Sequence, residues 1–269
     1  MKDLAKQVVG RSIAVPGVQP KLSLSLFDDL EGASRLTIVG ALSGNYILKP
    51  PFDDYPEMPQ NEHISMRIAE SLGINVVKSS LIRLASGELA YITKRIDRSE
   101  DGEKTHMIDM YQITEAFDKY KSSMEKIAKA LTVYSSNAGL DKIFLFELAL
   151  YAFIIGNNDM HLKNFSMILK YERWTLAPAY DLLNVSIANP EDKEQMALSV
   201  NGKKNKLTKA DFMVFGKNIG LTEKQIKGAF ERLIYNESKY LEWINSSFLS
   251  SEMIENYSFT IESRRKVLM

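Results

Sequence analysis

The chain has 269 residues, of which 45% are apolar and 25% charged, the balance of an ordinary globular protein with one large domain or two lobes. Lys and Arg together number 34, as do Asp and Glu, so a formal net charge of zero argues against binding nucleic acid or anionic membrane through bulk charge. Cysteine is absent, which excludes disulfides, Cys-ligated zinc and thiol nucleophiles, and no apolar signal peptide opens the sequence, so we expect a cytoplasmic protein.

The N-terminal part of the sequence is predicted to form mainly β-strands. Apolar and polar residues alternate in residues 21–28, as in a half-buried strand. A helix is expected at residues 61–72, because Ile64, Ile68 and Leu72 recur with helical spacing and Gly73 follows. Further strands are expected at residues 35–39, 45–49, 76–84 and 88–95.

From about Asp109 the pattern becomes helical. Residues 143–155 are the most apolar stretch, but a membrane span needs roughly twenty residues, so a buried core helix is expected here. Helices are predicted at residues 123–133, 141–155, 208–219 and 222–248, with one hairpin of strands at 165–170 and 173–176. We therefore predict an α+β, two-lobed, protein-kinase-like fold, with a β-rich lobe at 1–108 and a helical lobe at 109–269.

A run of polar residues directly follows the most apolar helix: Gly-Asn-Asn-Asp-Met-His-Leu-Lys-Asn at 156–164. Unpaired polar groups are costly when buried, so the fold must hold this run for a reason. Asn164 lies five positions after Asp159, the offset of the protein-kinase catalytic loop. In that loop the Asp orients the acceptor hydroxyl and the Asn binds a metal ion. The alternative is an ordinary Asn/Asp turn at a helix end.

Two further residues match the order of kinase motifs. Asp181 follows the predicted hairpin, where kinases place a metal-binding Asp, although an Asp here could also be a helix cap. Lys49 ends an apolar strand and is similar to the strand lysine that pairs nucleotide phosphates. Glu62 is a candidate ion-pair partner for Lys49, or simply an acid in the first turn of a helix.

The segment before the first strand reads Ser-Ile-Ala-Val-Pro-Gly-Val-Gln-Pro-Lys from Ser12 to Lys21. It lacks the G-x-G-x-x-G pattern, and its single Gly between two prolines also suits a surface turn. Its place before the strand that leads to Lys49 is that of a loop covering phosphates.

Taken together, Val-Gln-Pro-Lys, Tyr-Ile-Leu-Lys-Pro, the Asn-Asp-Met-His-Leu-Lys-Asn loop and Ala-Tyr-Asp-Leu-Leu resemble the HipA family of bacterial toxin kinases. The similarity runs from about Ser12 to at least Leu183, and the short chain is most similar to HipT kinases of three-component HipB–HipS–HipT systems. The resemblance implies a Ser/Thr protein kinase that uses ATP and Mg²⁺.

The resemblance also implies a role for each matching residue. Asp159 is the implied catalytic base, Asn164 and Asp181 are the implied magnesium ligands, and Lys49 is the implied phosphate-binding lysine. The other implied ATP contacts are the loop residues Ala14, Val15, Pro16, Gly17, Val18 and Gln19, the hinge residues Ile108, Asp109 and Met110, and His161, Leu162, Lys163 and Tyr180.

This sequence departs from HipA in two ways. HipA carries an N-terminal subdomain before the loop, whereas only about eleven residues precede it here, so we expect a separate HipS-like protein in its place. HipA also has an autophosphorylated serine three residues before the loop Gly; here that position is Ala14, which makes Ser12 the candidate.

The family implies a substrate and partners. The expected substrate is a serine of an aminoacyl-tRNA synthetase, with tryptophanyl-tRNA synthetase favoured, and phosphorylation would arrest translation and growth in persistence. The expected partners are a HipS-like inhibitor and a HipB-like DNA-binding antitoxin, so that DNA is reached only through the latter.

Two other functions remain open. A lipid or small-molecule kinase shares the Asp-x-His-x-x-Asn order of the phosphoinositide-kinase loop, although zero net charge and the lack of a basic amphipathic helix speak against a membrane surface. A catalytically silent module that only binds a repressor is the other alternative, and the intact set of Lys49, Asp159, Asn164 and Asp181 argues against it.

Overall fold

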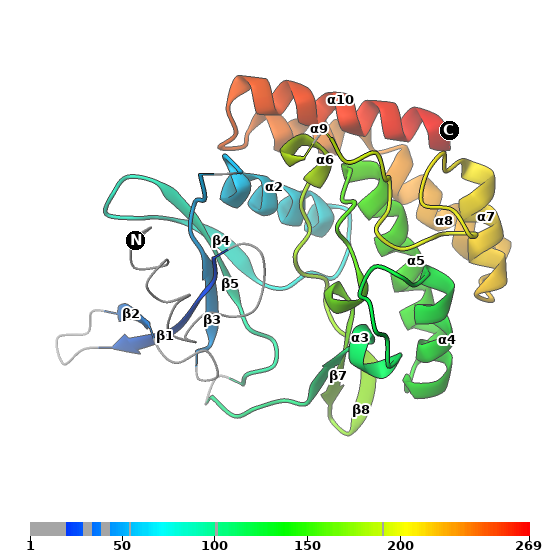
Figure 1. The fold of residues 1–269 in the computed structure, drawn as a ribbon, viewed down its shortest axis with the longest axis horizontal. Helices are drawn as coiled ribbons and strands as arrows, with labels where there is room; N and C mark the ends of the chain where they lie inside the picture. Colours follow the sequence, from blue (N-terminus) through cyan, green and yellow to red (C-terminus); the bar gives the residue numbers. More distant parts are fainter. Residues whose placement is uncertain (1–19, 29–33, 39–43, 54, 100–101, 190) are drawn as a thin grey trace. The chain divides into compact units, whose positions relative to one another are not determined.

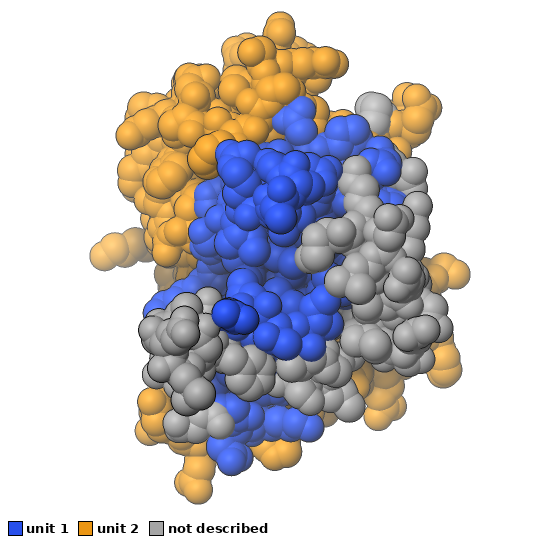
Figure 2. Space-filling view, turned by 90° about the vertical axis from the view of Figure 1, so that its left-hand side faces the viewer, with its two compact units in different colours: residues 1–63, 77–105 blue, residues 64–76, 106–269 orange. Residues whose placement is uncertain are grey.

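The computed structural model describes residues 20–28, 34–38, 44–53, 55–99, 102–189 and 191–269. The chain divides into two compact units, which we call unit 1 (Met1–His63 and Val77–Thr105) and unit 2 (Ile64–Val76 and His106–Met269). Figure 2 shows them in different colours. The division falls within a helix, after His63.

Unit 1 contains a five-stranded antiparallel sheet in the order β2-β1-β3-β5-β4 (Figure 1). Its core consists of inward-facing apolar side chains, among them Leu22, Leu24 and Leu48. Every strand expected from the alternating pattern is present, to within a few residues. The strands are β1 (Leu22–Asp28), β2 (Ser34–Ile38), β3 (Tyr46–Lys49), β4 (Ser79–Arg83) and β5 (Leu89–Lys94).

Helix α2 (Met58–Ser71) begins earlier than the expected residue 61. Pro59 lies in its first turn, where a missing N–H costs little because the first N–H groups of a helix have no helical acceptor. Pro59, the last of a cluster of prolines, is therefore compatible with the first turn of α2. The helix is followed by Gly73, which has a positive φ of 79°.

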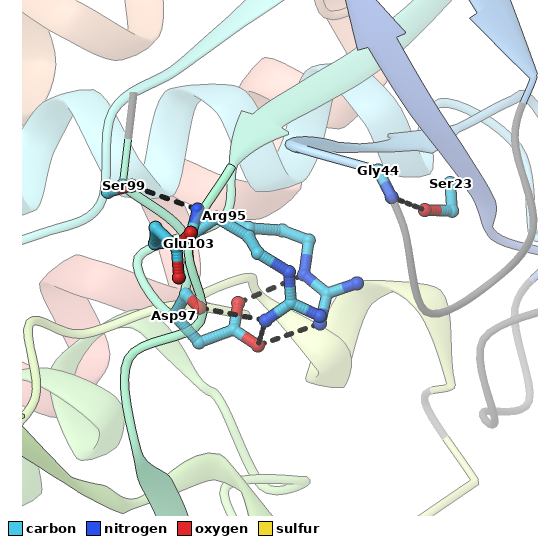
Figure 3. A network of polar contacts seen from close by, with 7 residues as sticks. Ser23, Gly44, Arg95, Asp97, Ser99 and Glu103 are labelled. Carbon is cyan, nitrogen blue, oxygen red and sulfur yellow. Dashed lines mark hydrogen bonds and ion pairs between the residues drawn. The ribbon is translucent and has the colours of Figure 1, made fainter. Parts of the chain in front are cut away.

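A small network of ion pairs lies in the C-terminal part of unit 1 (Figure 3). The Asp97 carboxylate accepts hydrogen bonds from Nε and Nη2 of Arg95 at 2.9 and 2.7 Å and from Nη1 of Arg98 at 2.6 Å. Burial raises the pKa of Asp97, but the hydrogen bond and charge of Arg95 and the charge of Arg98 outweigh it and hold the pKa below its ordinary value. The carboxylate therefore stays ionised and fixes both arginines.

Unit 2 is mainly helical, and α5 forms its centre. The residues of α5 from Leu148 to Ile155 are buried, and α4, α8 and α10 pack against this helix. None of the helices in the described part of the chain is both long and apolar enough to cross a membrane. The helices are α3 (Met110–Ile113), α4 (Met124–Tyr134), α5 (Ala138–Ile155), α6 (Val185–Ala188), α7 (Lys209–Asn218), α8 (Glu223–Ile234), α9 (Glu237–Asn245) and α10 (Ser251–Leu268).

A three-stranded antiparallel sheet lies beside these helices in the order β6-β7-β8. It is built from β6 (Met107–Asp109), β7 (Ser166–Lys170) and β8 (Arg173–Leu176). The predicted hairpin is confirmed, and Tyr171 and Glu172 at its tip both have positive φ, at 51° and 59°. Positive φ at both central residues matches the right-handed twist of the strands in a two-residue turn.

One predicted helix is wrong. The periodic stretch at residues 222–248 was expected to be a single helix, but the chain breaks into α8 and α9 around Tyr235 and Asn236. Asn236 Nδ2 donates to the backbone oxygen of Arg232 at 2.7 Å. A side-chain donor thus satisfies a carbonyl that a continuing helix would bond with its own backbone, which favours termination.

Candidate active site

In unit 1 the predicted pair of Lys49 and Glu62 is present. Lys49 ends β3, Glu62 lies on α2, and the two residues are 4% and 2% exposed. The Lys49 ammonium lies 2.6 Å from Oε1 and 2.7 Å from Oε2 of Glu62, so it bridges the carboxylate. Lys49 Nζ also lies 5.5 Å from the ring centre of Tyr91. A buried lysine is thereby kept charged and oriented.

In unit 2 the polar loop begins where α5 ends at Gly156. Gly156 has the left-handed φ of 72°, and a Cβ there would lie 2.9 Å from Oδ1 of Asn184 and closer still to Oγ of Ser186. Only glycine fits both the conformation and the space. The chain therefore ends the buried helix α5 at Gly156 and turns directly into the polar loop.

The two asparagines after Gly156 hold this loop from inside. The Asn157 side chain accepts from the N–H of Asp159 at 3.3 Å and donates to the backbone oxygen of Asp181 at 3.4 Å. Asn158 Nδ2 donates to the backbone oxygen of Glu194 at 3.1 Å. Both asparagines are buried, at 1% and 5% exposure. Asn157 thus ties the segment of Asp159 to the segment of Asp181, and Asn158 ties it to the segment of Glu194.

The structure brings together Asn164 and Asp181, the two predicted metal ligands. Asn164 Nδ2 donates to Oδ2 of Asp181 at 2.9 Å, and Asn164 Oδ1 accepts from the N–H of His161 at 3.1 Å. Asp181 adopts φ of 61°, in the left-handed region that Asp tolerates better than most residues. Burial, together with the charge of Lys119, lowers the pKa of His161 although Asp159 acts in the opposite direction, which favours the neutral imidazole.

This pair supplies donor types of a magnesium site, a carboxylate and an amide; the amide oxygen accepts from the N–H of His161 and the amide nitrogen faces Asp181. Mg²⁺ prefers carboxylate and amide oxygens and is usually bound by one or two carboxylates together with substrate phosphates. The described residues contain no cluster of three or more His, Cys, Asp or Glu that could hold a metal ion by itself. Asp181 and Asn164 would hold the ion.

Lys163 and Tyr180 take part in a second polar group in unit 2. The Tyr180 hydroxyl lies 2.6 Å from Oγ of Ser166 and donates to the backbone oxygen of Lys163 at 3.0 Å. Lys163 Nζ lies 4.7 Å from the ring centre of Tyr111. Leu162, which precedes Lys163 in the polar loop, is fully buried. The Tyr180 hydroxyl thus joins β7 to the polar loop, and the Tyr111 ring contacts the same loop from α3.

The predicted hinge residues lie at the start of unit 2. Ile108 belongs to β6 with its side chain 38% exposed, and Asp109 caps α3 by accepting from the N–H of Gln112. Met110 is buried, and its N–H donates to the backbone oxygen of Phe165 at 2.8 Å. That N–H is engaged within unit 2, so adenine binding by this segment stays a prediction.

Several predicted site residues lie outside the described residues. They are Ser12, the autophosphorylation candidate, and the loop residues Ala14, Val15, Pro16, Gly17, Val18 and Gln19.

One neighbour of Asp159 was not predicted from the sequence. Tyr120, in the segment between α3 and α4, donates its hydroxyl to Oδ1 of Asp159 at 2.6 Å. Its position 39 residues before Asp159 carries no local spacing signal. Only the tertiary structure brings the two side chains together.

Residues 13–239 match the family described as the HipA-like C-terminal domain. A Haemophilus influenzae protein named "Putative kinase" is 30% identical over 96% of this chain and 82% of its own length. "Putative kinase Y4mE" of Sinorhizobium fredii is 27% identical over 96% of this chain and 64% of its own length. The serine/threonine-protein kinase toxin HipA of Shewanella oneidensis is 26% identical over 70% of this chain and 47% of its own length.

Two solved structures have a similar fold. Shewanella oneidensis HipA, in a complex with HipB and operator DNA, aligns with a TM-score of 0.78 at 21% identity, over 97% of this chain and 70% of that one. The Helicobacter pylori proinflammatory kinase CtkA aligns with a TM-score of 0.60 at 15% identity, over 82% of this chain and 86% of that one. The predicted α+β kinase-like fold is therefore confirmed, and the chain belongs to the HipA-like C-terminal domain family.

Proposed function

We propose that this protein is an ATP- and Mg²⁺-dependent serine/threonine protein kinase. The observation that carries the proposal is the hydrogen-bonded pair of Asn164 and Asp181, five and twenty-two positions after Asp159 in hydrogen-bonded loop segments of unit 2. The buried Lys49–Glu62 pair of unit 1 supports it independently, because kinases use such a pair to hold nucleotide phosphates.

The proposed reaction moves the γ-phosphoryl group of ATP to a serine hydroxyl. The bond from the γ-phosphorus to the bridging oxygen breaks, ADP leaves with that electron pair, and the acceptor oxygen forms the new bond. The acceptor proton goes to Asp159, while Lys49 holds phosphate oxygens. When bound by Asn164 and Asp181, Mg²⁺ supplies neutralisation of the phosphate charge. The protein contributes mainly position and electrostatics.

The remaining sequence-predicted contacts are part of the same proposal. His161, Leu162, Lys163 and Tyr180 would lie beside the nucleotide, the loop at residues 14–19 would cover its phosphates, and residues 108–110 would bind adenine. Ser12 would be the autophosphorylation site. A phosphoserine adds about −1.5 to −2 charges, which beside ATP phosphates would repel the nucleotide and switch the kinase off.

The biological setting follows from the family. We infer a toxin of a toxin–antitoxin system, similar to HipT, acting in the cytoplasm on an aminoacyl-tRNA synthetase, with tryptophanyl-tRNA synthetase favoured. The relative of known structure is in a complex with HipB and DNA, which supports a HipB-like antitoxin as partner here. A HipS-like protein is the second proposed partner.

The central test is Asp159→Asn. This variant keeps the size of the side chain and the loop contacts but removes the proton acceptor, so transfer should fall about 10²- to 10⁴-fold. Nucleotide affinity, measured by calorimetry, should stay close to that of the unaltered chain. Near-normal transfer by the variant would contradict the role of Asp159.

The same preparations test Ser12. After incubation with Mg-ATP, peptide mass spectrometry should find phosphate on Ser12 in the unaltered chain and none in Asp159→Asn. Phosphate on other serines alone would contradict the regulatory role of Ser12 and leave the kinase proposal standing. ATP binding without any transfer to protein, lipid or small acceptors would instead support the silent repressor-binding module.

A further inference from the structure

The carboxylate of Asp159 is held by a residue that the proposed reaction does not otherwise use. Tyr120 donates its hydroxyl to Oδ1 of Asp159 at 2.6 Å, a short distance typical of a hydrogen bond to a charged acceptor. Among the described residues, no other hydrogen bond reaches this carboxylate. Oδ2 is therefore the oxygen that remains for an acceptor hydroxyl.

Tyr120 is itself fixed against the catalytic loop. Its ring meets the ring of His161 edge-on, with centroids 5.1 Å apart, and Lys119 Nζ lies 4.8 Å from the Tyr120 ring centre. The N–H of Leu162 donates to the backbone oxygen of Lys119 at 3.2 Å, and the N–H of Tyr120 donates to Oδ1 of Asp118 at 2.9 Å. Backbone, ring and hydroxyl contacts thus all hold one short segment against the loop.

The electrostatics keep the hydroxyl a donor. Burial, and then the hydrogen bond and charge of Asp159, raise the pKa of Tyr120 far above its ordinary value. The phenol therefore keeps its proton and donates a hydrogen bond to the Asp159 carboxylate. A carboxylate anchored through one oxygen has a defined rotation about its terminal bond, and transfer rates depend steeply on such orientation.

We propose that Tyr120 is a positioning residue for phosphoryl transfer, whose hydroxyl holds Oδ1 of Asp159 so that Oδ2 receives the acceptor proton. This inference rests on the kinase function proposed above. The opposite arrangement is that the Tyr120 hydroxyl occupies the place of the acceptor and blocks it. The two arrangements predict opposite changes in the transfer rate, because removing a positioning group slows transfer and removing a blocking group accelerates it.

The test variant is Tyr120→Phe, which deletes the hydroxyl and keeps the ring that contacts His161 and Lys119. The matched control is Tyr134→Phe at the end of α4, where the side chain is 56% exposed. Single-turnover transfer of labelled γ-phosphate from Mg-ATP to the chain and to water is measured against ATP concentration. Tyr120→Phe should lower the saturating rate about 10- to 100-fold, the scale that lost orientation costs. The half-saturating ATP concentration and the melting temperature should not change.

A double variant separates positioning from a general structural role. Combined with Asp159→Asn, Tyr120→Phe should add little to the loss, because residues that act as a unit are not additive. The inference would be overturned if Tyr120→Phe left the transfer rate unchanged or raised it. It would also be overturned if Tyr120→Phe caused the same loss with Asp159 as with Asn at position 159. In each of these cases, transfer by the unaltered chain would leave the kinase function standing. An unaltered chain that binds Mg-ATP and transfers nothing would overturn the kinase function and this inference together.

Discussion

At the scale of single residues, Asp181 is the most constrained member of the candidate site. Its φ of 61° costs an ordinary side chain roughly 1 kcal/mol or more, and Asp and Asn tolerate this region best. The conformation places Oδ2 within hydrogen-bond distance of Asn164. The strained backbone conformation of Asp181 therefore positions its carboxylate beside Asn164, the other proposed metal ligand.

Asp181→Asn is the variant that isolates the negative charge, since Asn suits the same backbone conformation. We expect affinity for Mg-ATP to fall by about ten-fold or more, roughly 1.4 kcal/mol, because the carboxylate acts through the ion. Affinity for metal-free ATP, titrated by calorimetry with a chelator present, should change little. Glu191→Gln, at an exposed acid of the same unit, controls for net charge. Equal losses with and without Mg²⁺ would assign Asp181 a purely structural role.

The sequence predicted some residues of this site and could not predict others. Asp159, Asn164 and Asp181 could be proposed from the sequence because the order of loop and hairpin is a local feature that residue spacing preserves. Tyr120 was missed because its hydrogen bond to Asp159 spans 39 residues, and a lone Tyr in a polar segment carries no periodic signal. The left-handed conformation of Asp181 depends likewise on the surrounding fold.

At the scale of elements, the Lys49–Glu62 pair joins β3 to α2 within unit 1. Both side chains are almost fully buried, at 5% and 2% exposure. Burying two charges costs several kcal/mol each, which their attraction repays only with good geometry. Such a pair is weak evidence for stability but strong evidence for a positioned charge.

Breaking and replacing this pair should therefore have different effects. Glu62→Ala leaves the ammonium buried without its partner and should lower the free energy of unfolding by about 3–5 kcal/mol in urea titrations. The apolar double variant Lys49→Met/Glu62→Leu should recover most of that stability but not phosphate transfer. Glu70→Ala, which breaks an exposed pair on the same helix, should cost at most about 1 kcal/mol. Recovery of transfer in the double variant would contradict the proposed role of Lys49.

Gly44 is a second element-scale constraint, at the entrance to β3 (Figure 3). Its N–H donates to Oγ of Ser23 at 3.1 Å, and a Cβ would lie 2.7 Å from both the backbone nitrogen and oxygen of Leu24. Gly44→Ala should therefore destabilise the protein by about 1–3 kcal/mol, since strand backbone cannot yield as a side chain can. Gly228→Ala, at an exposed position of α8 with open space around it, should be neutral or stabilising. Differential scanning calorimetry compares the two, and equal melting temperatures would contradict the close contact at Gly44.

The elements themselves were predicted well where one local pattern decides. Alternation in β1 and the apolar run of α5 were sufficient, because each element buries one face or its whole surface. The break between α8 and α9 was missed, since apolar residues continue across it. The end of α8 is marked by side chains that donate to its last carbonyls, from Asn236 to Arg232, from Tyr240 to Leu233 and from Arg265 to Ile234. The early start of α2 was missed because a proline in a first turn looks the same as a proline in a loop.

At the scale of the whole molecule, the two units contribute different chemistry to the proposed reaction. Unit 1 carries the buried Lys49, and unit 2 carries Asp159, Asn164 and Asp181. A ligand that binds only the native state stabilises it by an amount that depends on its concentration relative to Kd, about 2.7 kcal/mol at a hundredfold excess. Thermal stability therefore reports on ligand binding by the whole chain, without requiring any turnover.

The last prediction uses this linkage. Mg-ATP at a hundredfold excess over its Kd should raise the melting temperature by about 5–10 °C, because each kcal/mol shifts a chain of this size by roughly 2–4 °C. At the same nucleotide concentration, Asp159→Asn should keep the shift, since Asp159 is proposed to meet the acceptor rather than the nucleotide. Lys49→Met should lose most of the shift. Asp181→Asn, whose affinity is expected to be about ten-fold lower or more, should lose about half of it or more. Chelation of Mg²⁺ should reduce the shift in the unaltered chain more than in Asp181→Asn. Scanning fluorimetry gives all these values side by side. A full shift in Lys49→Met would remove unit 1 from nucleotide binding, and a full shift in Asp181→Asn would remove its carboxylate from metal binding.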